Sequence, residues 1–211
     1  MTGDIAALCR RLGLAASDAQ IAALADYLAL LQRWNATFNL TAVRDPDRML
    51  TQHLADCLAV IEPLSRQQPG PGRLLDVGSG GGLPGVVIAT LRPDLDVSCV
   101  DTVGKKAAFI RQAAGALQLS NLHAEHARVE KLDRPPFDLI TARAFSSLAD
   151  FTAWTRPLLA EGGVWMAMKG RSPDDEIQAL LPSIEVFHVE PIEVPGLEAE
   201  RCLVWMRPRA A

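Results

Sequence analysis

The stretch LLDVGSGGGLPG, residues 74–85, is the part of the sequence whose residue types and spacing most clearly indicate chemistry. An apolar run ends at Asp76, and Gly78, Gly80 and Gly82 follow with one residue between each. Glycines at this spacing let the backbone turn sharply and approach a ligand, at the point where a strand of an open α/β sheet leads into a helix. The stretch therefore predicts a loop that binds a cofactor.

Two classes of cofactor use such a loop. A dinucleotide-binding loop needs Gly-x-Gly-x-x-Gly, which Gly80, Gly82 and Gly85 supply, but in that register the first glycine comes too late after the strand. The pattern Asp-x-Gly-x-Gly-x-Gly from Asp76 begins directly at the end of the strand. It resembles motif I of S-adenosylmethionine-dependent methyltransferases, so we favour that cofactor over a nicotinamide.

Acidic residues after the next two strands strengthen this interpretation. Asp101 closes the following apolar run, 19 residues after Gly82, and a carboxylate there accepts hydrogen bonds from both ribose hydroxyls of an adenosine. The alternative is an aspartate that caps the helix expected from 104. Arg128, Val129 and Glu130 follow the third expected strand, where such folds contact adenine. An exposed loop is the other interpretation of these residues.

These motifs require a sheet that brings the ends of several strands together. The expected strands are 73–77, 96–101, 122–126, 137–142 and 163–168, and the expected helices are about 84–92, 104–118, 147–159 and 173–181. Such alternation requires a parallel sheet covered on both faces. Two β-like runs, 184–190 and 202–207, follow without a long helix between them and predict an antiparallel edge. The fold class is therefore α/β, a Rossmann-like and mostly parallel seven-stranded sheet of the class I methyltransferase type.

The first third of the chain has the apolar spacing of helices. Ser17 and Gln20 form an expected capping box, and Asp45 followed by Pro46 is an expected start of a later helix.

The composition of residues 65–72, SRQQPGPG, is typical of a linker. We therefore expect an N-terminal helical region, 1–66, followed by a methyltransferase domain, 73–211.

Length and charge limit the possible partners. Among 211 residues, 25 acidic against 21 basic side chains leave a net charge of −4. A chain with this balance does not bind nucleic acid through its total charge, so such a partner must be recognised by local basic groups. The candidates are Lys105, Lys106 and Arg111 on one expected helix, and Arg44 and Arg48 beside the NLTAV segment. Simple solvation is the alternative for each.

The cysteines, the histidines and the hydropathy indicate the compartment. The four cysteines are scattered without a Cys-x-x-Cys pair, which is typical of free thiols in a reducing compartment. No apolar run approaches the roughly 20 residues of a membrane span, and the first residues lack a secretory signal pattern. His123 and His126 are paired in sequence without further metal ligands. We therefore expect a cytoplasmic protein without membrane contact and without a metal site.

From about Asn39 to Trp205, the sequence closely resembles one family, ribosomal RNA small subunit methyltransferase G, also called GidB. The segments that carry the resemblance are NLTAVRDP (39–46), the helix start at 53–56, LLDVGSGGGLPG (74–85), the segment 92–112, RVE (128–130), ARAF (142–145), MKG (168–170) and ERCLVWM (200–206). The combination of GLPG with ARAF and MKG is the specific part of this resemblance.

The resemblance implies methyl transfer from S-adenosyl-L-methionine to N7 of one guanine in 16S rRNA, with S-adenosyl-L-homocysteine as the product. The implied partner is 16S rRNA within the small ribosomal subunit, and we expect a monomer with no DNA partner. Carried over to this sequence, the family's cofactor residues are Gly78, Leu83, Val129, Glu130 and Arg143.

The implied reaction depends on positioning rather than on acid–base chemistry. Guanine N7 carries a lone pair and no proton, so its attack on a methyl group requires no general base. Arg143 and Lys169 follow strand ends on the face where the ligand should lie, and they are the candidate catalytic residues. Either could bind guanine O6, an RNA phosphate or the methionine carboxylate. A solvated charge is the alternative for each.

Two other classes of function stay open at this point. A nicotinamide-dependent oxidoreductase is disfavoured, because the sequence has no Tyr-x-x-x-Lys pair and little chain left for a substrate domain. A non-catalytic ribosome- or RNA-binding module on a methyltransferase fold is disfavoured by the intact glycines together with Asp101, Arg143 and Lys169.

Overall fold

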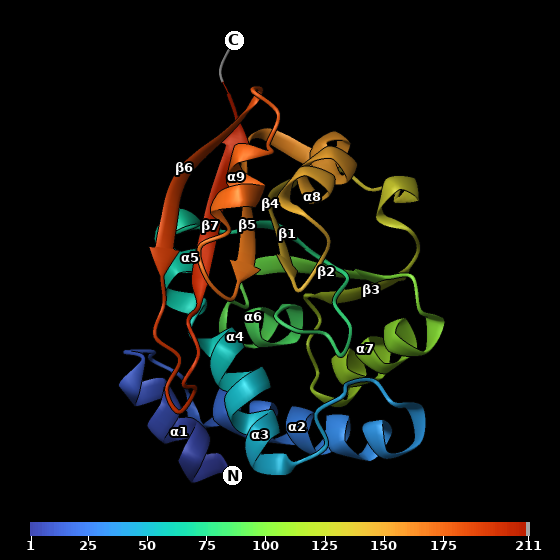
Figure 1. The fold of residues 1–211 in the computed structure, drawn as a ribbon. Coiled ribbons are helices and arrows are strands. Elements are labelled where there is room, and N and C mark those ends of the chain that lie inside the picture. The colour runs from blue at the N-terminus through green and yellow to red at the C-terminus, as the bar shows by residue number, and fades with distance from the viewer. Residues whose placement is uncertain (210–211) are drawn as a thin grey trace.

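The glycine-rich loop follows an interior strand of a seven-stranded sheet in the computed structural model, which describes residues 1–209 (Figure 1). The strands are β1 (Gly72–Val77), β2 (Leu95–Asp101), β3 (Leu122–His126), β4 (Phe137–Arg143), β5 (Leu159–Lys169), β6 (Ile184–Pro191) and β7 (Cys202–Pro208). Their order in the sheet is β3-β2-β1-β4-β5-β7-β6, in which β1 to β5 are parallel and β7 is antiparallel to both of its neighbours. The predicted α/β fold with an antiparallel edge is confirmed.

The strand order switches direction at β1. The chain adds β2 and β3 on one side of β1 and then continues with β4 on the other side. In open α/β sheets, a ligand binds in the crevice at the carboxyl ends of the strands beside such a reversal. The sheet order therefore places a ligand site beside the residues that follow β1, β2 and β4.

Helices cover both faces of the sheet. They are α1 (Thr2–Arg11), α2 (Asp18–Phe38), α3 (Pro46–Met49), α4 (Asp56–Leu58), α5 (Ile61–Gln67), α6 (Gly85–Leu91), α7 (Gly104–Ala116), α8 (Leu148–Thr155) and α9 (Asp174–Gln178). Three further helical turns are the π-helix η1 (Leu50–Ala55) and the 3₁₀ turns η2 (Val129–Lys131) and η3 (Arg156–Leu158). None of the helices within residues 1–209 is long and apolar enough to span a bilayer.

The expected helix and strand at 147–159 and 163–168 have different limits in the structure. Helix α8 ends at Thr155 and β5 begins at Leu159. Pro157 lies between them in η3, and a proline has no backbone N–H with which to continue a helix. The expected helix 173–181 is likewise shorter, since α9 covers Asp174–Gln178.

Both predicted helix starts in the N-terminal region are confirmed. Oγ of Ser17 accepts a hydrogen bond from the amide of Gln20, whose side chain accepts one from the amide of Ser17. The carboxylate of Asp45 accepts a hydrogen bond from the amide of Arg48 at 2.9 Å. The π-helix η1 that follows α3 was not predicted, and such wider turns are frequent at functional sites.

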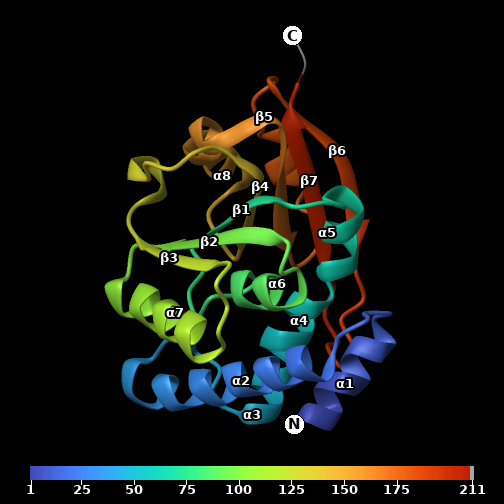
Figure 2. The ribbon, with the colours of Figure 1, turned by 180° about the vertical axis from the view of Figure 1, so that it is seen from behind.

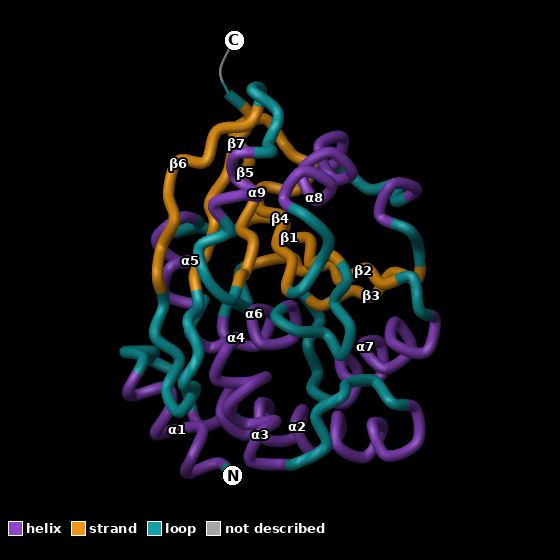
Figure 3. Tube along the Cα trace, in the orientation of Figure 1, coloured by secondary structure: helices purple, strands orange, loops and turns teal. Residues whose placement is uncertain are grey.

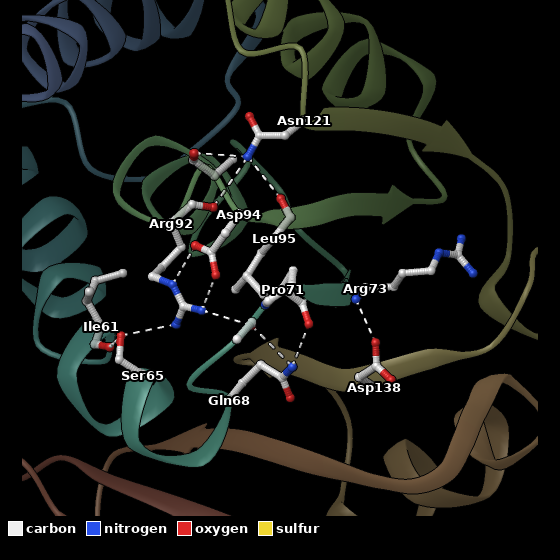
Figure 4. Close-up of polar contacts among 12 residues, drawn as sticks. Ile61, Ser65, Gln68, Pro71, Arg73, Arg92, Asp94, Leu95, Asn121 and Asp138 are labelled. Atoms are coloured by element: carbon white, nitrogen blue, oxygen red, sulfur yellow. Dashed lines mark hydrogen bonds and ion pairs between the residues drawn. The ribbon is translucent and has the colours of Figure 1, made fainter.

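The expected linker, 65–72, is largely ordered by side chains. Its first residues belong to α5 and its last residue begins β1. The guanidinium of Arg92 donates to Oγ of Ser65 at 3.1 Å, to the backbone oxygen of Gly70 at 3.2 Å, and to both carboxylate oxygens of Asp94 (Figure 4). The connection between the helical region and the sheet is therefore 68–71, half of the predicted segment. The division into 1–66 and 73–211 stays a prediction, and residues 210–211 lie outside the described residues.

Two hydrophobic clusters fill the space on either side of the sheet. One joins α6 and α7 to the N-terminal helices, with Leu28, Val86 and Phe109 among its buried side chains. The other packs α8 and α9 against the opposite face, around Phe151 and Trp165. Figures 2 and 3 show α6 and α7 between the sheet and α2. The N-terminal helices therefore form an outer layer that supports the helices next to the site.

Candidate cofactor and active site

The glycine loop has a backbone path that side chains would block. Gly78, Gly80 and Gly82 have φ values of +68°, +58° and +85°, in the left-handed region that favours glycine. A Cβ on Gly82 would lie 2.5 Å from a methyl carbon of Val86, at the first turn of α6. The alternation of glycines is therefore explained by backbone geometry and by close packing of the loop on α6.

Two cavities lie on either side of this loop and meet at Gly78, which lines both. The Arg143 cavity, of about 700 Å³, is lined by Leu40, Gln52, His53, Asp56, Gly78, Ser79, Gly80, Gly81, Leu83, Arg143, Ala144, Met168, Lys169, Gly170, Leu197, Ala199 and Arg201. The Asp101 cavity, of about 280 Å³, is lined by Val77, Gly78, Val100, Asp101, Thr102, Val103, Lys106, Ala127, Arg128, Val129, Glu130, Phe145 and Trp154.

Apart from Gly82, every predicted site residue lines at least one of these cavities. Gly78, Gly80, Leu83, Arg143 and Lys169 line the Arg143 cavity. Asp101, Val129 and Glu130 line the Asp101 cavity together with Gly78. Gly82 instead packs against the side chains of Val86 and Ile110.

Asp101 connects the glycine loop to the start of α7. One carboxylate oxygen accepts a hydrogen bond from the amide of Gly80 at 3.0 Å, and the other accepts one from the amide of Val103 at 2.8 Å. The ammonium of Lys106 lies 3.8 Å away. Because an ionised carboxylate has about four acceptor positions, these bonds leave capacity for two ribose hydroxyls. Asp101 therefore orders the glycine loop and the start of α7, and its carboxylate still faces the cavity.

The remaining walls of the Asp101 cavity combine apolar and charged side chains. The rings of Phe145 and Trp154 meet edge to face, with centroids 5.8 Å apart. Val129 is buried beside them, and Glu130 forms an ion pair with Arg128 at 2.8 Å. A flat base between these walls and a diol near Asp101 is the chemistry that the cavity fits.

Arg143 is held by the N-terminal region. Its Nη1 donates to the backbone oxygen of Gln52 and to the buried carboxylate of Asp56, both at 3.3 Å. The other oxygen of Asp56 accepts from Nε of Arg201 at 2.8 Å. Nε and Nη2 of Arg143 make no hydrogen bond to residues 1–209. Asp56 therefore fixes two arginines side by side, and Arg143 retains donors for a ligand.

Lys169 is an ion-paired residue rather than a solvated charge. Its ammonium lies 2.9 and 2.8 Å from the two carboxylate oxygens of Glu176 on α9. Glu176 also accepts a hydrogen bond from the amide of Leu148 at 2.8 Å, at the start of α8. Lys169 therefore joins β5 to both helices on that face while it lines the Arg143 cavity.

Asp76, the first residue of the motif, has a structural position below the loop. It is fully buried, and one of its carboxylate oxygens accepts a hydrogen bond from the amide of Gly85 at 2.9 Å. Its other oxygen has no partner within residues 1–209. Burial raises the pKa of Asp76 from 3.8 to about 6, against the opposing effect of the Gly85 amide.

This carboxyl makes the stability of the fold depend on pH. Its pKa is 3.8 in the unfolded chain and about 6 in the folded chain, so the folded state binds more protons between those values. Stability from this group is therefore greatest below the lower value and is lost as the pH rises through that window. The loss is about 3 kcal/mol at 1.36 kcal/mol per pKa unit.

We expect the Asp76→Asn variant to lack this loss, because an amide does not ionise. Urea unfolding from about pH 4 to about pH 7 would measure the free energy of unfolding of wild type and variant. As the pH rises, the value for the variant should increase relative to the value for the wild type. The other carboxylates titrate in both proteins, so their contribution to the pH dependence cancels in this difference. A difference that stays constant across the range would contradict this assignment.

Several residues of the site were not identified individually from the sequence. Asp56 and Arg201 lie in segments that carry the family resemblance, but their ion pair joins residues 145 positions apart. Phe145 and Trp154 line the Asp101 cavity, and Tyr27 contacts the glycine loop from below. Local patterns contain no signal for such contacts.

The cysteines and the possible metal ligands are the remaining side chains with reactive chemistry. The four cysteines, all buried, are free thiols, as predicted. Within residues 1–209, no three His, Cys, Asp or Glu side chains gather in a way that could hold a metal ion.

The strand order, the glycine loop after β1 and the carboxylate after β2 together define a Rossmann-like S-adenosylmethionine-dependent methyltransferase. The fold is also that of the 1,6-didemethyltoxoflavin-N1-methyltransferase from Burkholderia thailandensis, solved with bound S-adenosylhomocysteine. That structure matches with a TM-score of 0.59 and 16% identity, over 88% of this chain and 90% of that chain.

The chain belongs to the GidB family, rRNA small subunit methyltransferase G, whose model matches residues 20–204. The Ribosomal RNA small subunit methyltransferase G of Acidovorax sp. (strain JS42) is 62% identical over 209 residues, which cover 94% of this chain and 92% of that protein. The protein of the same name from Leptothrix cholodnii is 64% identical over 200 residues, with the same coverage. The predicted family is confirmed, and the nicotinamide and non-catalytic alternatives are not supported.

S-adenosylmethionine is the cofactor of this class, and the residues present fit it. The Asp101 cavity offers apolar walls and a carboxylate to an adenosine, and the Arg143 cavity offers a guanidinium to a carboxylate. The two cavities join at Gly78, where a Cβ would lie 2.8 Å from the ring of Phe145. Glycine at this position therefore lets the ring of Phe145 pack against the loop where the two cavities meet.

Proposed function

We propose that the chain transfers the methyl group of S-adenosylmethionine to N7 of a specific guanine in 16S rRNA of the small ribosomal subunit. The observation that carries this proposal is the Arg143 cavity, which joins the cofactor loop and contains fixed hydrogen-bond donors. S-adenosylmethionine supplies an electrophilic methyl group when bound. The protein supplies orientation for an in-line displacement.

The side chains around the Arg143 cavity suit an acceptor atom without a proton. Both oxygens of Asp56 are engaged by arginines. Nε2 of His53 lies 2.8 Å from Oγ1 of Thr41, and burial followed by the nearby Arg143 lowers the pKa of His53. Asp56 therefore presents no free carboxylate oxygen to the cavity, and Nδ1 of His53 has no partner within residues 1–209 but is buried away from solvent. This arrangement suits guanine N7, whose attack releases no proton from the base.

Arg143 is the residue that we place closest to the reaction. Arg143 lines the cavity that adjoins Gly78, where its unengaged donors would bind guanine O6 and leave N7 exposed. The same charge would lie near the methionine carboxylate of the cofactor. Lys169, paired with Glu176, would hold α8 and α9 beside β5 and contribute positive charge to the acceptor side.

For the cofactor, we assign roles to the residues of the two cavities. Asp101 would accept hydrogen bonds from the ribose hydroxyls, and Val129 and Glu130 would contact the adenine. Gly78 and Gly80 would let the ligand approach the backbone, Gly82 would maintain the loop, and Leu83 would contact the methionine end.

RNA recognition in this proposal uses local arginines and shape, because the net charge of the chain is −4. Arg48 approaches Gln52, which lines the Arg143 cavity, and Arg44 donates a hydrogen bond to the side chain of Asn39. We propose that the protein acts as a cytoplasmic monomer on 16S rRNA within the small subunit, with no DNA partner. A folded ribosomal particle offers one shaped site to such a surface.

The proposal is tested by mapping N7-methylguanine in 16S rRNA from cells with and without this gene product, by strand cleavage at the modified base. We expect one cleavage site to disappear without the protein and to return with the wild-type gene, but not with the Asp101→Ala variant. Unchanged cleavage in the absence of the protein would contradict the proposal. So would a lost methyl group on another atom or base.

A further inference from the structure

The glycine loop is fixed from below by the N-terminal helix α2. The hydroxyl of Tyr27 donates a hydrogen bond to the backbone oxygen of Gly81 at 2.6 Å. One helical turn later, Leu31 packs so closely that a Cβ on Gly81 would lie 3.1 Å from its methyl carbon. Residues 54 positions apart in the sequence thus meet at the centre of the cofactor loop.

The peptide group between Gly81 and Gly82 is held by hydrogen bonds at both its carbonyl and its amide. The amide of Gly82 donates to the backbone oxygen of Ser79 at 2.8 Å, and the carbonyl of the same peptide group is the one that accepts from Tyr27. On the other side, the amide of Gly80 is held by Asp101 at 3.0 Å. Glycines on both sides of that peptide would otherwise let it rotate.

Tyr27 is suited to this contact by its surroundings. Its side chain is fully buried, and its ring lies 6.2 Å from that of Phe109 on α7. Burial raises the pKa of the Tyr27 phenol well above its usual range, so the hydroxyl keeps its proton and remains a donor. A second contact steadies the helix, since the side-chain amide of Gln20 donates to the backbone oxygen of Thr90 at the end of α6, at 2.9 Å.

We propose that Tyr27 is a positioning residue of the cofactor site, whose hydroxyl holds the Gly81 peptide and thereby sets the affinity for S-adenosylmethionine. Tyr27 lines neither cavity, so it acts through the loop rather than on the ligand. The N-terminal helical region is then part of the cofactor site and not only a layer beside it. This inference depends on cofactor binding, and it is independent of which base of the RNA is methylated.

The Tyr27→Phe variant tests the proposal because it removes the hydroxyl and keeps the ring. By calorimetry, we expect its affinities for S-adenosylmethionine and S-adenosylhomocysteine to fall about 10-fold, which corresponds to one lost hydrogen bond. The KM for S-adenosylmethionine should rise by a similar factor, while kcat at saturating cofactor changes little. Unchanged affinity in a folded variant would overturn the proposal.

Thr155→Val is the matched control. The hydroxyl of Thr155 is also fully buried, and it accepts a hydrogen bond from Trp165 at 2.8 Å on the opposite face of the sheet. Its removal should lower thermal stability and leave cofactor affinity unchanged. An equal loss of affinity in the control would show that general destabilisation explains the effect, and the proposal would fall.

A second measurement uses the protein with its tyrosine side chain in place. Tyr27 is the only tyrosine in the sequence, so protein labelled with 3-fluorotyrosine gives a single ¹⁹F resonance. We expect this resonance to shift in a titration with S-adenosylhomocysteine, with the dissociation constant that calorimetry gives. A resonance that stays in place while calorimetry reports binding would overturn the proposal. Failure of the wild type to bind would instead count against the proposed function.

Discussion

Replacing Asp101 by alanine is expected to weaken the binding of S-adenosylmethionine about 100-fold or more, since hydrogen bonds to a charged acceptor contribute about 1.5–3 kcal/mol each. The variant loses the proposed acceptor of the ribose hydroxyls. It also loses the partner of the Gly80 amide, 3.0 Å away, and that of the Val103 amide, 2.8 Å away. The loop and the start of α7 then lose the group that holds them together.

The Asp101→Asn variant separates these two effects. Its amide oxygen keeps one acceptor, but the amino group faces a backbone N–H, so we expect an affinity between those of wild type and the alanine variant. Asp96→Ala is the matched control, because this exposed carboxylate lies earlier on the same strand and pairs with His123. Calorimetry would measure the affinity of each protein for S-adenosylmethionine. Equal affinities in wild type and Asp101→Ala would contradict the assigned role.

Replacing Arg143 by alanine should reduce the rate of methyl transfer by about 10²–10³-fold, the usual effect of removing one fixed donor from an active site. The guanidinium is held in place by Asp56 at 3.3 Å, so the donors that face the cavity are oriented before a ligand arrives. The fold should tolerate this change, because Asp56 keeps its ion pair with Arg201 at 2.8 Å.

Arg143→Lys tests whether shape or charge matters. A lysine keeps the positive charge beside Asp56 but loses the planar fork, so we expect most of the rate loss to remain. Arg207→Ala is the control, since that arginine pairs with Glu185 on the exposed edge formed by β6 and β7. Single-turnover kinetics on small subunits would measure the rate, and calorimetry the cofactor affinity. Normal rates in Arg143→Ala would contradict the proposed role.

The fold and the cofactor loop could be predicted because they depend on local patterns. The alternation of strands and helices determines a parallel sheet, and the carboxyl ends of parallel strands lie at one edge. For that reason, residues after three separate strands, such as Gly78, Asp101 and Arg143, could be placed together without any knowledge of their contacts. Their spacing in the sequence and their residue types were sufficient.

The contacts that orient the site could not be predicted in the same way. The bond from Tyr27 to Gly81 and the ion pair of Asp56 with Arg201 join segments 54 and 145 residues apart. Such pairs depend on how helices pack on the sheet, and periodicity within one segment does not encode that packing. The contact of Arg92 with the connection 68–71, from the end of α6, could not be predicted for the same reason.

The position of β7 has a consequence for how the protein is made. Of the strands described, β7 is synthesised last, yet it lies between β5 and β6. Its side chains Leu203 and Trp205 also complete the cluster that contains the N-terminal helices. Until Cys202–Pro208 have left the ribosome, β5 is an open edge that other chains could pair with. A messenger cut short before this strand would therefore yield an aggregation-prone chain, because the sheet and the cluster on its N-terminal side close only with β7.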